Sequence, residues 1–143
     1  VEPLRKAAET KPFLGICLGM QLLADSSEER GNHTGLGLIP GKVELITVPS
    51  GLRLPHVGWN STTIHKPAPL FVGSRSGESF YFVHSYHYVC DSQYIAASTD
   101  YGADVVAAVQ KGHVFGVQFH PERSQASGLR LLGNFVRYVE GTC

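Results

Sequence analysis

The sequence predicts an α/β fold, and three features of its 143 residues support that prediction. A short apolar strand at 13–16 turns sharply into a segment of helical character at 19–24. A long middle part, 41–119, is rich in β-branched and aromatic residues and reads as a series of strands. An amphipathic helix at 125–140 then closes the chain. Helices at both ends of a strand-rich middle are typical of a sheet that is covered by helices.

Length and composition predict one domain over 1–143 with a hydrophobic core, because 43% hydrophobic residues is ordinary for a globular chain. Twelve basic and 12 acidic residues give zero net charge, so we expect no nucleic-acid partner. No apolar run approaches the ~18 residues of a membrane-spanning helix, so we expect no membrane partner. Three cysteines without C-x-x-C spacing argue against disulfides and fit a cytoplasmic protein.

The first predicted element is a short helix at 2–10. Pro3 suits its first turn, because a proline there loses no helical hydrogen bond. Leu4, Ala7 and Ala8 share one face of this helix, and we expect that face to pack on the sheet.

Cys17 lies in the turn between the strand at 13–16 and the following helix. Gly15 and Gly19 stand two residues before and after it, a spacing that lets the backbone form the strained turn of a nucleophile elbow. N–H groups at the start of the helix then face the sulfur and favour the thiolate. The alternative is that Cys17 is a small buried residue in a strand that ends in glycine.

A base for this nucleophile is predicted near the end of the chain. An apolar strand at 115–119 delivers His120 at its tip, Pro121 stops the strand, and Glu122 follows. The Glu122 carboxylate is placed to hold the second imidazole nitrogen of His120, as the orienting member of a triad does. We expect the helix start and His120 together to lower the pKa of the Cys17 thiol.

The rest of the chain is predicted to be mainly strand. The helix after the elbow should carry residues 22–24 and give way to a polar loop at 25–32. Strands follow at 41–48, 52–57, 60–64 and 79–89, and a hairpin joins 94–99 to 103–110 through the turn at 100–102. The last helix should bury Leu129, Leu132, Phe135, Val136 and Val139 and end at Gly141.

The histidines give no pattern that is typical of a metal site. Alternation places Phe80, Phe82 and His84 on one face of the strand at 79–89. His87 is three residues from His84 and so lies on the other face, which predicts that the two do not bind one ion. The remaining histidines without spaced partners are expected on the surface or in loops; these are His33, His56, His65 and His113.

Two of these motifs resemble those of the class I glutamine amidotransferases. The stretches 15–21 and 119–122 are similar to the sites that carry the Cys-His-Glu triad of that family. The segments 35–41, 55–60, 80–86 and 124–125 are similar to one of its branches, the glutaminase subunits of imidazole glycerol phosphate synthases from histidine biosynthesis. This resemblance runs from residue 1 to the last helix.

The resemblance implies a flavodoxin-like, mixed and mostly parallel sheet flanked by helices, and hydrolysis of glutamine to glutamate and ammonia without a cofactor. Cys17, His120 and Glu122 take the triad positions, and the Leu18 N–H is an oxyanion donor. Gln21 and the backbone around His84, Ser85 and Tyr86 take the positions that bind glutamine. From the residues alone, Gln21 is equally explained as a solvent-facing helix residue.

The resemblance also implies a partner, a cyclase or synthase subunit with a (β/α)₈ barrel, in a heterodimer that makes imidazole glycerol phosphate and AICAR. Trp59, Asn60 and Tyr81 take positions at that interface. The segment around Trp59 is broken by Pro55 and Gly58, so we expect a loop that presents the tryptophan as an interface anchor. The alternative is that Trp59 folds back into the core.

One feature of the family has no match here. Its members begin with several dozen further residues that include a Pro-Gly-x-Gly loop with a second oxyanion donor, so we expect the chain to be incomplete at its N-terminus. Two other functions remain open. One is a different hydrolase or amidotransferase of the same fold, and the other is a binding module that has lost catalysis.

Overall fold

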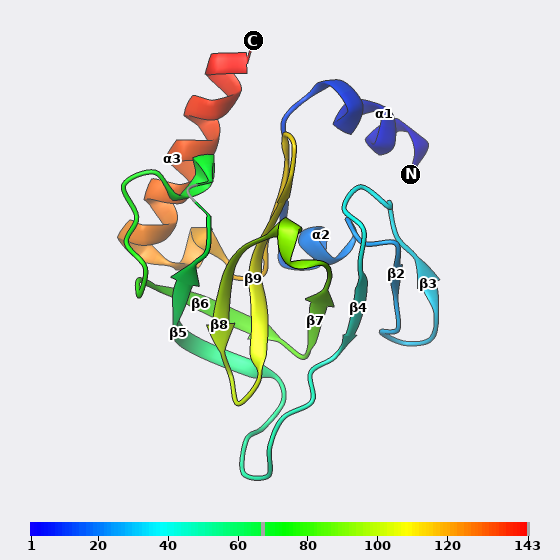
Figure 1. Ribbon diagram of the computed structural model, residues 1–143, viewed down its shortest axis with the longest axis vertical. Coiled ribbons are helices and arrows are strands. Elements are labelled where there is room, and N and C mark those ends of the chain that lie inside the picture. Colours follow the sequence, from blue (N-terminus) through cyan, green and yellow to red (C-terminus); the bar gives the residue numbers. More distant parts are fainter. Residues whose placement is uncertain (67, 143) are drawn as a thin grey trace.

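The computed structural model describes residues 1–66 and 68–142 (Figure 1). Its helices are α1 (Glu2–Thr10), α2 (Leu18–Gln21) and α3 (Gln125–Thr142), with 3₁₀ turns η1 (Pro69–Phe71), η2 (Ser92–Tyr94) and η3 (Pro121–Arg123). Its strands are β1 (Phe13–Ile16), β2 (Ser26–Ser27), β3 (His33–Thr34), β4 (Lys42–Leu45), β5 (His56–Ile64), β6 (Ser79–His84), β7 (Tyr86–Val89), β8 (Ile95–Asp100), β9 (Asp104–Lys111) and β10 (Val114–Val117). No helix in these two ranges is long and apolar enough to cross a membrane.

The strands form a six-stranded sheet in the order β1-β10-β9-β8-β5-β6 and a four-stranded sheet in the order β3-β2-β4-β7. The α/β class is confirmed, but the expectation of a mostly parallel sheet fails for the described residues. Only β1 with β10 and β2 with β4 pair in parallel. Short turns join the antiparallel pairs β2–β3, β8–β9 and β9–β10, because a parallel pair would need a long crossover.

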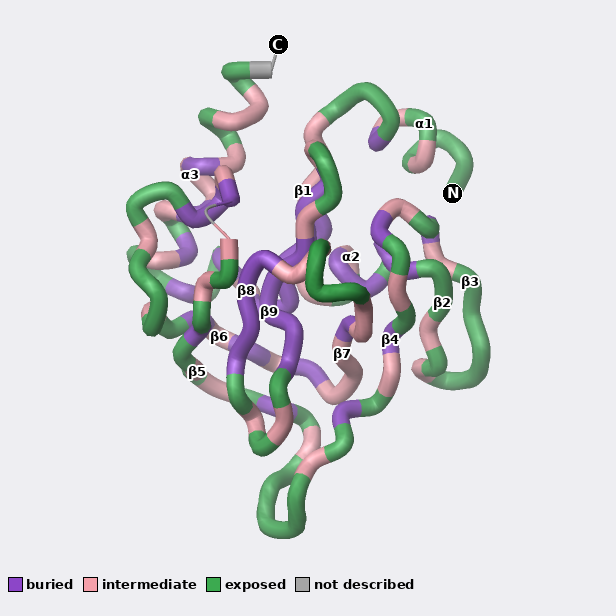
Figure 2. Tube along the Cα trace, viewed as in Figure 1, coloured by how far each residue is buried: buried purple, intermediate pink, exposed green. Residues whose placement is uncertain are grey.

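Two apolar clusters form the core, on opposite faces of β10. Phe115 and Val117 point to one face, where α3 covers the sheet and contributes Leu131. Val114 points to the other face, toward Met20 and the residues of the four-stranded sheet. Figure 2 shows the buried residues concentrated along β8 and β9, which lie between these layers. The sheet therefore holds β1 and β10 rigidly, and the two candidate catalytic segments follow those two strands.

The terminal helices partly match the predictions. Helix α1 has the predicted bounds, but Leu4 is exposed and Ala8 is its buried residue. Helix α3 continues through Gly141, and the prediction of Leu129 and Val136 as core residues is wrong because both are exposed. The face that packs on the sheet carries Phe135, as predicted, together with Leu131, Asn134 and Tyr138.

Four predicted segments in the middle of the chain are also wrong. The helix after the elbow ends at Gln21, and the predicted loop at 25–32 contains β2, because β4 supplies it with a parallel partner. The two strands predicted around Gly58 are one strand, β5, which is held on both sides by β6 and β8. The single strand predicted at 79–89 divides at Ser85, where the chain passes from one sheet to the other.

Candidate active site

The structure contains the strained turn predicted at Cys17. Its backbone has φ 53° and ψ −109°, a positive-φ conformation that is strained for any residue other than glycine. Its N–H donates to the carbonyl of Val117 at 2.8 Å, which extends the pairing of β1 with β10. A Cβ on Gly15 would lie 2.4 Å from the carbonyl oxygen of Gly19, so the elbow needs glycine at that position. The turn therefore holds the Cys17 thiol at a defined position beyond the end of strand β1.

The environment of the thiol differs from the prediction, because the pKa of Cys17 is raised and not lowered. Burial is the largest cause, and the negative charge of Glu122 adds to it. The Leu18 N–H and the Gln118 amide act in the opposite direction by donating hydrogen bonds to the sulfur. Helix α2 has only four residues, so its dipole is too short to overcome the loss of water around the thiol.

The second and third predicted triad members form a pair. The Nδ1 atom of His120 lies 3.0 Å from Oε2 of Glu122, within the turn η3. The backbone N–H of His120 donates to the carbonyl of Tyr81, and the hydroxyl of Ser124 donates to the carbonyl of His120 at 2.6 Å. These bonds fix the base, and the Glu122 carboxylate leaves the Nε2 atom of His120 for proton transfer.

The thiol itself is not hydrogen-bonded to this base. Among the hydrogen bonds of residues 1–66 and 68–142, none joins Cys17 to His120, and the thiol points to the carbonyl of Val83 at 3.9 Å. A nucleophile and its base are often loosely aligned without substrate, so this arrangement fits a resting site.

A cavity of about 220 Å³ opens beside Cys17. Its lining residues include every residue predicted to bind glutamine; they are Cys17, Leu18, Gln21, Glu29, Val83, His84, Ser85 and Tyr86. The elbow supplies the first three, and the passage from β6 to β7 supplies the last four. The change of sheet at Ser85 therefore creates the wall that faces the nucleophile.

Sequence reasoning missed Gln118, which is fully buried between Cys17 and Gln21. Its Nε2 donates to the Cys17 sulfur at 3.7 Å, and its Oε1 accepts from Nε2 of Gln21 at 3.2 Å. The second hydrogen of Gln21 Nε2 goes to the carbonyl of Tyr86, also at 3.2 Å. A glutamine inside an apolar strand two residues before His120 is the sequence signal that could have identified it.

Both ring nitrogens of His84 are hydrogen-bonded within the protein, whereas Gln21 keeps one polar atom for a ligand. The His84 ring makes two internal hydrogen bonds, from Nδ1 to the carbonyl of Tyr86 at 2.8 Å and with Nδ1 of His56 at 2.9 Å. Burial lowers the pKa of His84 to about 4, so the ring is neutral near pH 7. His56 is buried as well, which corrects its predicted place on the surface. Both N–H groups of Gln21 are used, and its Oε1 is the atom left for a ligand.

The residues predicted at an interface lie together on β5 and β6. Trp59 is 50% exposed, which rules out the alternative that it folds into the core, but it sits in a strand and not in a loop. Its ring meets the edge of Tyr81 at 6.2 Å, and the Arg123 guanidinium lies 4.2 Å above the Tyr81 ring. The amide of Asn60 is directed inward, where it donates to the carbonyl of Asp100 at 2.8 Å.

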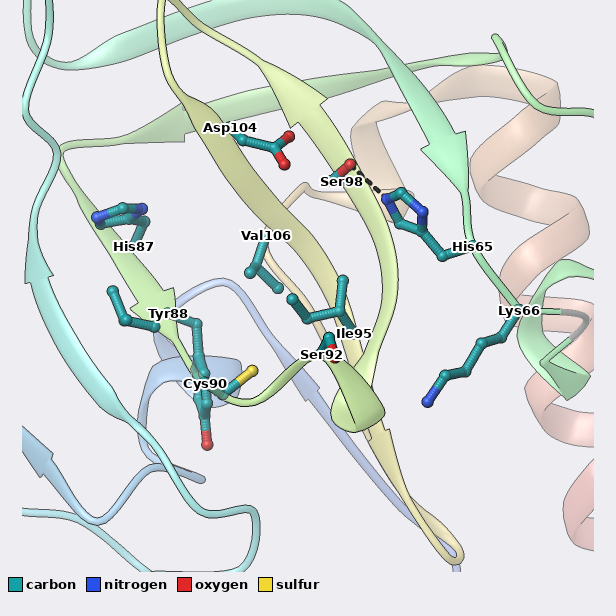
Figure 3. Close-up of a pocket in the computed structure, with 11 residues that line it drawn as sticks. His65, Lys66, His87, Tyr88, Cys90, Ser92, Ile95, Ser98, Asp104 and Val106 are labelled. Carbon is teal, nitrogen blue, oxygen red and sulfur yellow. Dashed lines mark hydrogen bonds between the residues drawn. The ribbon is translucent and has the colours of Figure 1, made fainter.

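A larger cavity of about 560 Å³ lies between β7 and the hairpin of β8 and β9 (Figure 3). It contains Cys90, whose pKa burial raises to about 11. No hydrogen bond in the described part of the chain joins Cys90 to a histidine, and His65 is paired with Ser98 at 2.7 Å. No group of three potential metal ligands lies there or elsewhere in the two described ranges. The smaller cavity at Cys17 is therefore the candidate active site.

Comparison with known proteins bears on this site. The family model described as "Glutamine amidotransferase class-I" matches residues 1–138, a range that contains the elbow and the His120–Glu122 pair. The chain belongs to the class I glutamine amidotransferases. This confirms the resemblance that the motifs at 15–21 and 119–122 predicted.

Relatives of this amidotransferase are named "Imidazole glycerol phosphate synthase subunit HisH". The one from Syntrophotalea carbinolica is 51% identical over 142 residues, which are 94% of this chain and 69% of the relative. The one from Methylococcus capsulatus is 51% identical over 143 residues, 94% of this chain and 66% of the relative. The chain thus spans about two thirds of the length of these relatives.

The fold of this amidotransferase is also found in solved structures. A glutamine amidotransferase from Thermotoga maritima matches with a TM-score of 0.63 at 18% identity, over 98% of this chain and 54% of that one. At this identity the match concerns the fold alone, and it agrees with the α/β class that the sequence predicts.

Proposed function

We propose that this amidotransferase is the glutaminase part of an imidazole glycerol phosphate synthase and hydrolyses glutamine to glutamate and ammonia at Cys17. The observation that carries the proposal is the strained elbow, which presents Cys17 and the Leu18 N–H to a cavity walled by residues 83–86. The identity of 51% to proteins named subunit HisH supports the choice among amidotransferase functions.

In the first half-reaction, Nε2 of His120 accepts the thiol proton of Cys17, and the thiolate attacks the side-chain amide carbon of glutamine. We assign stabilisation of the oxyanion that develops to the Leu18 N–H, whose hydrogen bond to the sulfur supports this role. His120 gives a proton from Nε2 to the departing nitrogen, so that ammonia leaves and a thioester remains on Cys17.

In the second half-reaction, water hydrolyses the thioester. His120 now accepts a proton from that water, and the Glu122 carboxylate stabilises the imidazolium that forms. The imidazolium then gives this proton to the Cys17 sulfur as the thioester breaks, so glutamate and the free thiol result. The 3.0 Å bond between His120 and Glu122 keeps the ring in one tautomer and orientation in both steps.

The hydrogen bonds of Gln21 suggest how the substrate is oriented. Because both of its N–H groups are bonded to Gln118 and Tyr86, only Oε1 of Gln21 can contact a ligand in the cavity. That oxygen accepts and does not donate, so we assign it to an N–H of the substrate. Ser85 and the backbone of His84 and Tyr86 complete the wall, because the His84 ring is already bonded on both nitrogens.

The surface formed by Trp59, Tyr81 and Arg123 supports a protein partner, which we propose is the (β/α)₈-barrel synthase subunit of a heterodimer. An exposed tryptophan beside a tyrosine and an arginine has the composition of an interface anchor. This surface adjoins the site, since His120 bonds to the carbonyl of Tyr81. Ammonia would then reach the synthase without release into the solvent.

A thiol nucleophile must stay reduced, which fits a cytoplasmic location.

An electrophilic glutamine analogue tests the proposal. The chain, alone and with its barrel partner, is treated with the analogue and examined by mass spectrometry, and the adduct should form on Cys17 and not on Cys90. Cys17→Ala should abolish glutamine-dependent synthesis by the complete enzyme and leave synthesis from added ammonium unchanged. Turnover of peptide or γ-glutamyl bonds without the partner would favour a different hydrolase, and partner binding without any adduct would favour a binding module.

A further inference from the structure

A chain of hydrogen bonds, buried at its His56–His84 link, connects the strand that carries Trp59 to the wall of the Cys17 cavity. Asn60 Nδ2 donates to the carbonyl of Asp100 at 2.8 Å and to Nε2 of His56 at 3.2 Å. His56 Nδ1 lies 2.9 Å from Nε2 of His84, and His84 Nδ1 lies 2.8 Å from the carbonyl of Tyr86. His56 and His84 are direct partners in the β5–β6 ladder, which explains why their rings meet.

The chemistry of the two ends fixes the direction of every bond in this chain. Both ends are backbone carbonyls, which only accept, so His84 must carry its proton on Nδ1 to donate to Tyr86. A neutral His84 then has a bare Nε2, and His56 must donate to it from its own Nδ1. The Nε2 atom of His56 is left to accept from Asn60, whose amide has one hydrogen for it and one for Asp100.

The surroundings keep both rings neutral. His56 is 2% exposed and His84 is 6% exposed. The His56 ring is stacked between Phe82 at 4.8 Å and Tyr101 at 4.2 Å, neither of which supplies a charge. Burial lowers the pKa of both histidines, and the nearby His56 and His87 rings oppose a charge on His84 as well. A proton on Nε2 of His84 would face the N–H of His56, so the ordered chain requires neutral rings.

We propose that His56 is a positioning residue for the glutaminase site, because it donates to Nε2 of His84 and so holds that ring, and with it the carbonyl of Tyr86, in place. This inference rests on the proposed function. The Tyr86 carbonyl accepts from His84 and from Gln21, and the Gln21 amide in turn meets Gln118. Without the donor at His56, Nε2 of His84 loses its partner and only the bond to Tyr86 still holds the ring. The ring can then shift, and the Tyr86 carbonyl is held less firmly.

The tautomers can be measured directly in the whole chain labelled with ¹⁵N-histidine. A long-range ¹H–¹⁵N correlation spectrum at pH 7 should show His56 and His84 as neutral rings protonated on Nδ1. A His84 ring protonated on Nε2 in the wild-type chain would overturn the proposal. This measurement needs no substrate, no partner and no variant.

Kinetics of the complete two-subunit enzyme provide the second test. His56→Leu removes the donor, and we expect kcat/KM for glutamine to fall about tenfold, mostly through KM, because the substrate-binding wall is what moves. His56→Asn has an amide N–H close to the position of imidazole Nδ1, so it should restore the bond to Nε2 of His84 and bring kcat/KM to within about threefold of wild type.

Thr62→Val is the matched control. Thr62 is also buried on β5, and its hydroxyl donates to the carbonyl of Glu78 at 3.0 Å, away from the cavity. Both Thr62→Val and His56→Leu should lower the melting temperature, but only the histidine variant should raise KM. Equal KM values in the two variants, with an active wild-type enzyme, would overturn the role of His56. An inactive wild-type enzyme would instead refute the proposed function. Should His56→Leu not fold, the wild-type tautomer spectrum and His56→Asn decide.

Discussion

The buried amide of Gln118 offers a sharp test of how the structure controls the nucleophile. Gln118→Met keeps the length and volume of the side chain but removes the N–H that lies 3.7 Å from the Cys17 sulfur. Because Gln118 is fully buried, water does not replace that donor. A hydrogen bond to a charged group contributes about 1.5–3 kcal/mol, and for a bond as long as this one we take about 1 kcal/mol, so the thiolate population below the thiol pKa should fall about fivefold.

The assay is the rate at which iodoacetamide alkylates Cys17 between pH 6 and 9, followed by mass spectrometry. Cys90 serves as an internal reference, since it lies in the other cavity and burial raises its pKa to about 11. Gln110→Met is a control variant, because the Gln110 side-chain amide donates to the nearby carbonyl of Gly112, away from Cys17. An unchanged Cys17 rate in Gln118→Met, or an equal fall at Cys90, would refute the assigned role of Gln118.

Three further predictions concern the base, the partner surface and pH. His120→Ala should slow glutamine turnover at least about 100-fold, and Glu122→Gln should slow it less. Glu122→Gln should nevertheless speed alkylation of Cys17, because the Glu122 charge raises the thiol pKa. Slower alkylation in Glu122→Gln would contradict this. Trp59→Ala should weaken calorimetric affinity for the barrel subunit by about 2 kcal/mol with an unchanged melting temperature, since the side chain is half exposed; a lower melting temperature would place Trp59 in the fold. His84 has a pKa of about 4 in the folded chain and 6.5 when exposed, so below pH 6.5 protons favour the unfolded chain. The free energy of unfolding in urea should fall by about 2 kcal/mol between pH 7.5 and 5.0. His84→Asn should reduce this loss.

The sequence alone determined the features that depend on local pattern. The glycine spacing around Cys17 predicted the elbow, and the strand end followed by Pro121 predicted where His120 and Glu122 lie. Helix α1 and the hairpin of β8 and β9 also follow from periodicity and turn residues within a dozen positions. In each case the residues that decide the conformation are neighbours in the chain, so their order carries the information.

Only the tertiary structure decided which groups share an environment. Gln118 meets Cys17 from 101 positions away, and His84 meets His56 from 28 positions away, through strand registers that no local pattern encodes. The same is true of the raised pKa of Cys17, which depends on how much water the neighbouring strands exclude from the thiol. The strand boundaries predicted around Gly58 and Ser85 differ from those in the structure for a related reason, because the partner strands on either side decide where a strand continues. Hydrogen-bond partners and burial are properties of the packed chain, and they are what turns the predicted triad into a site with a shaped cavity.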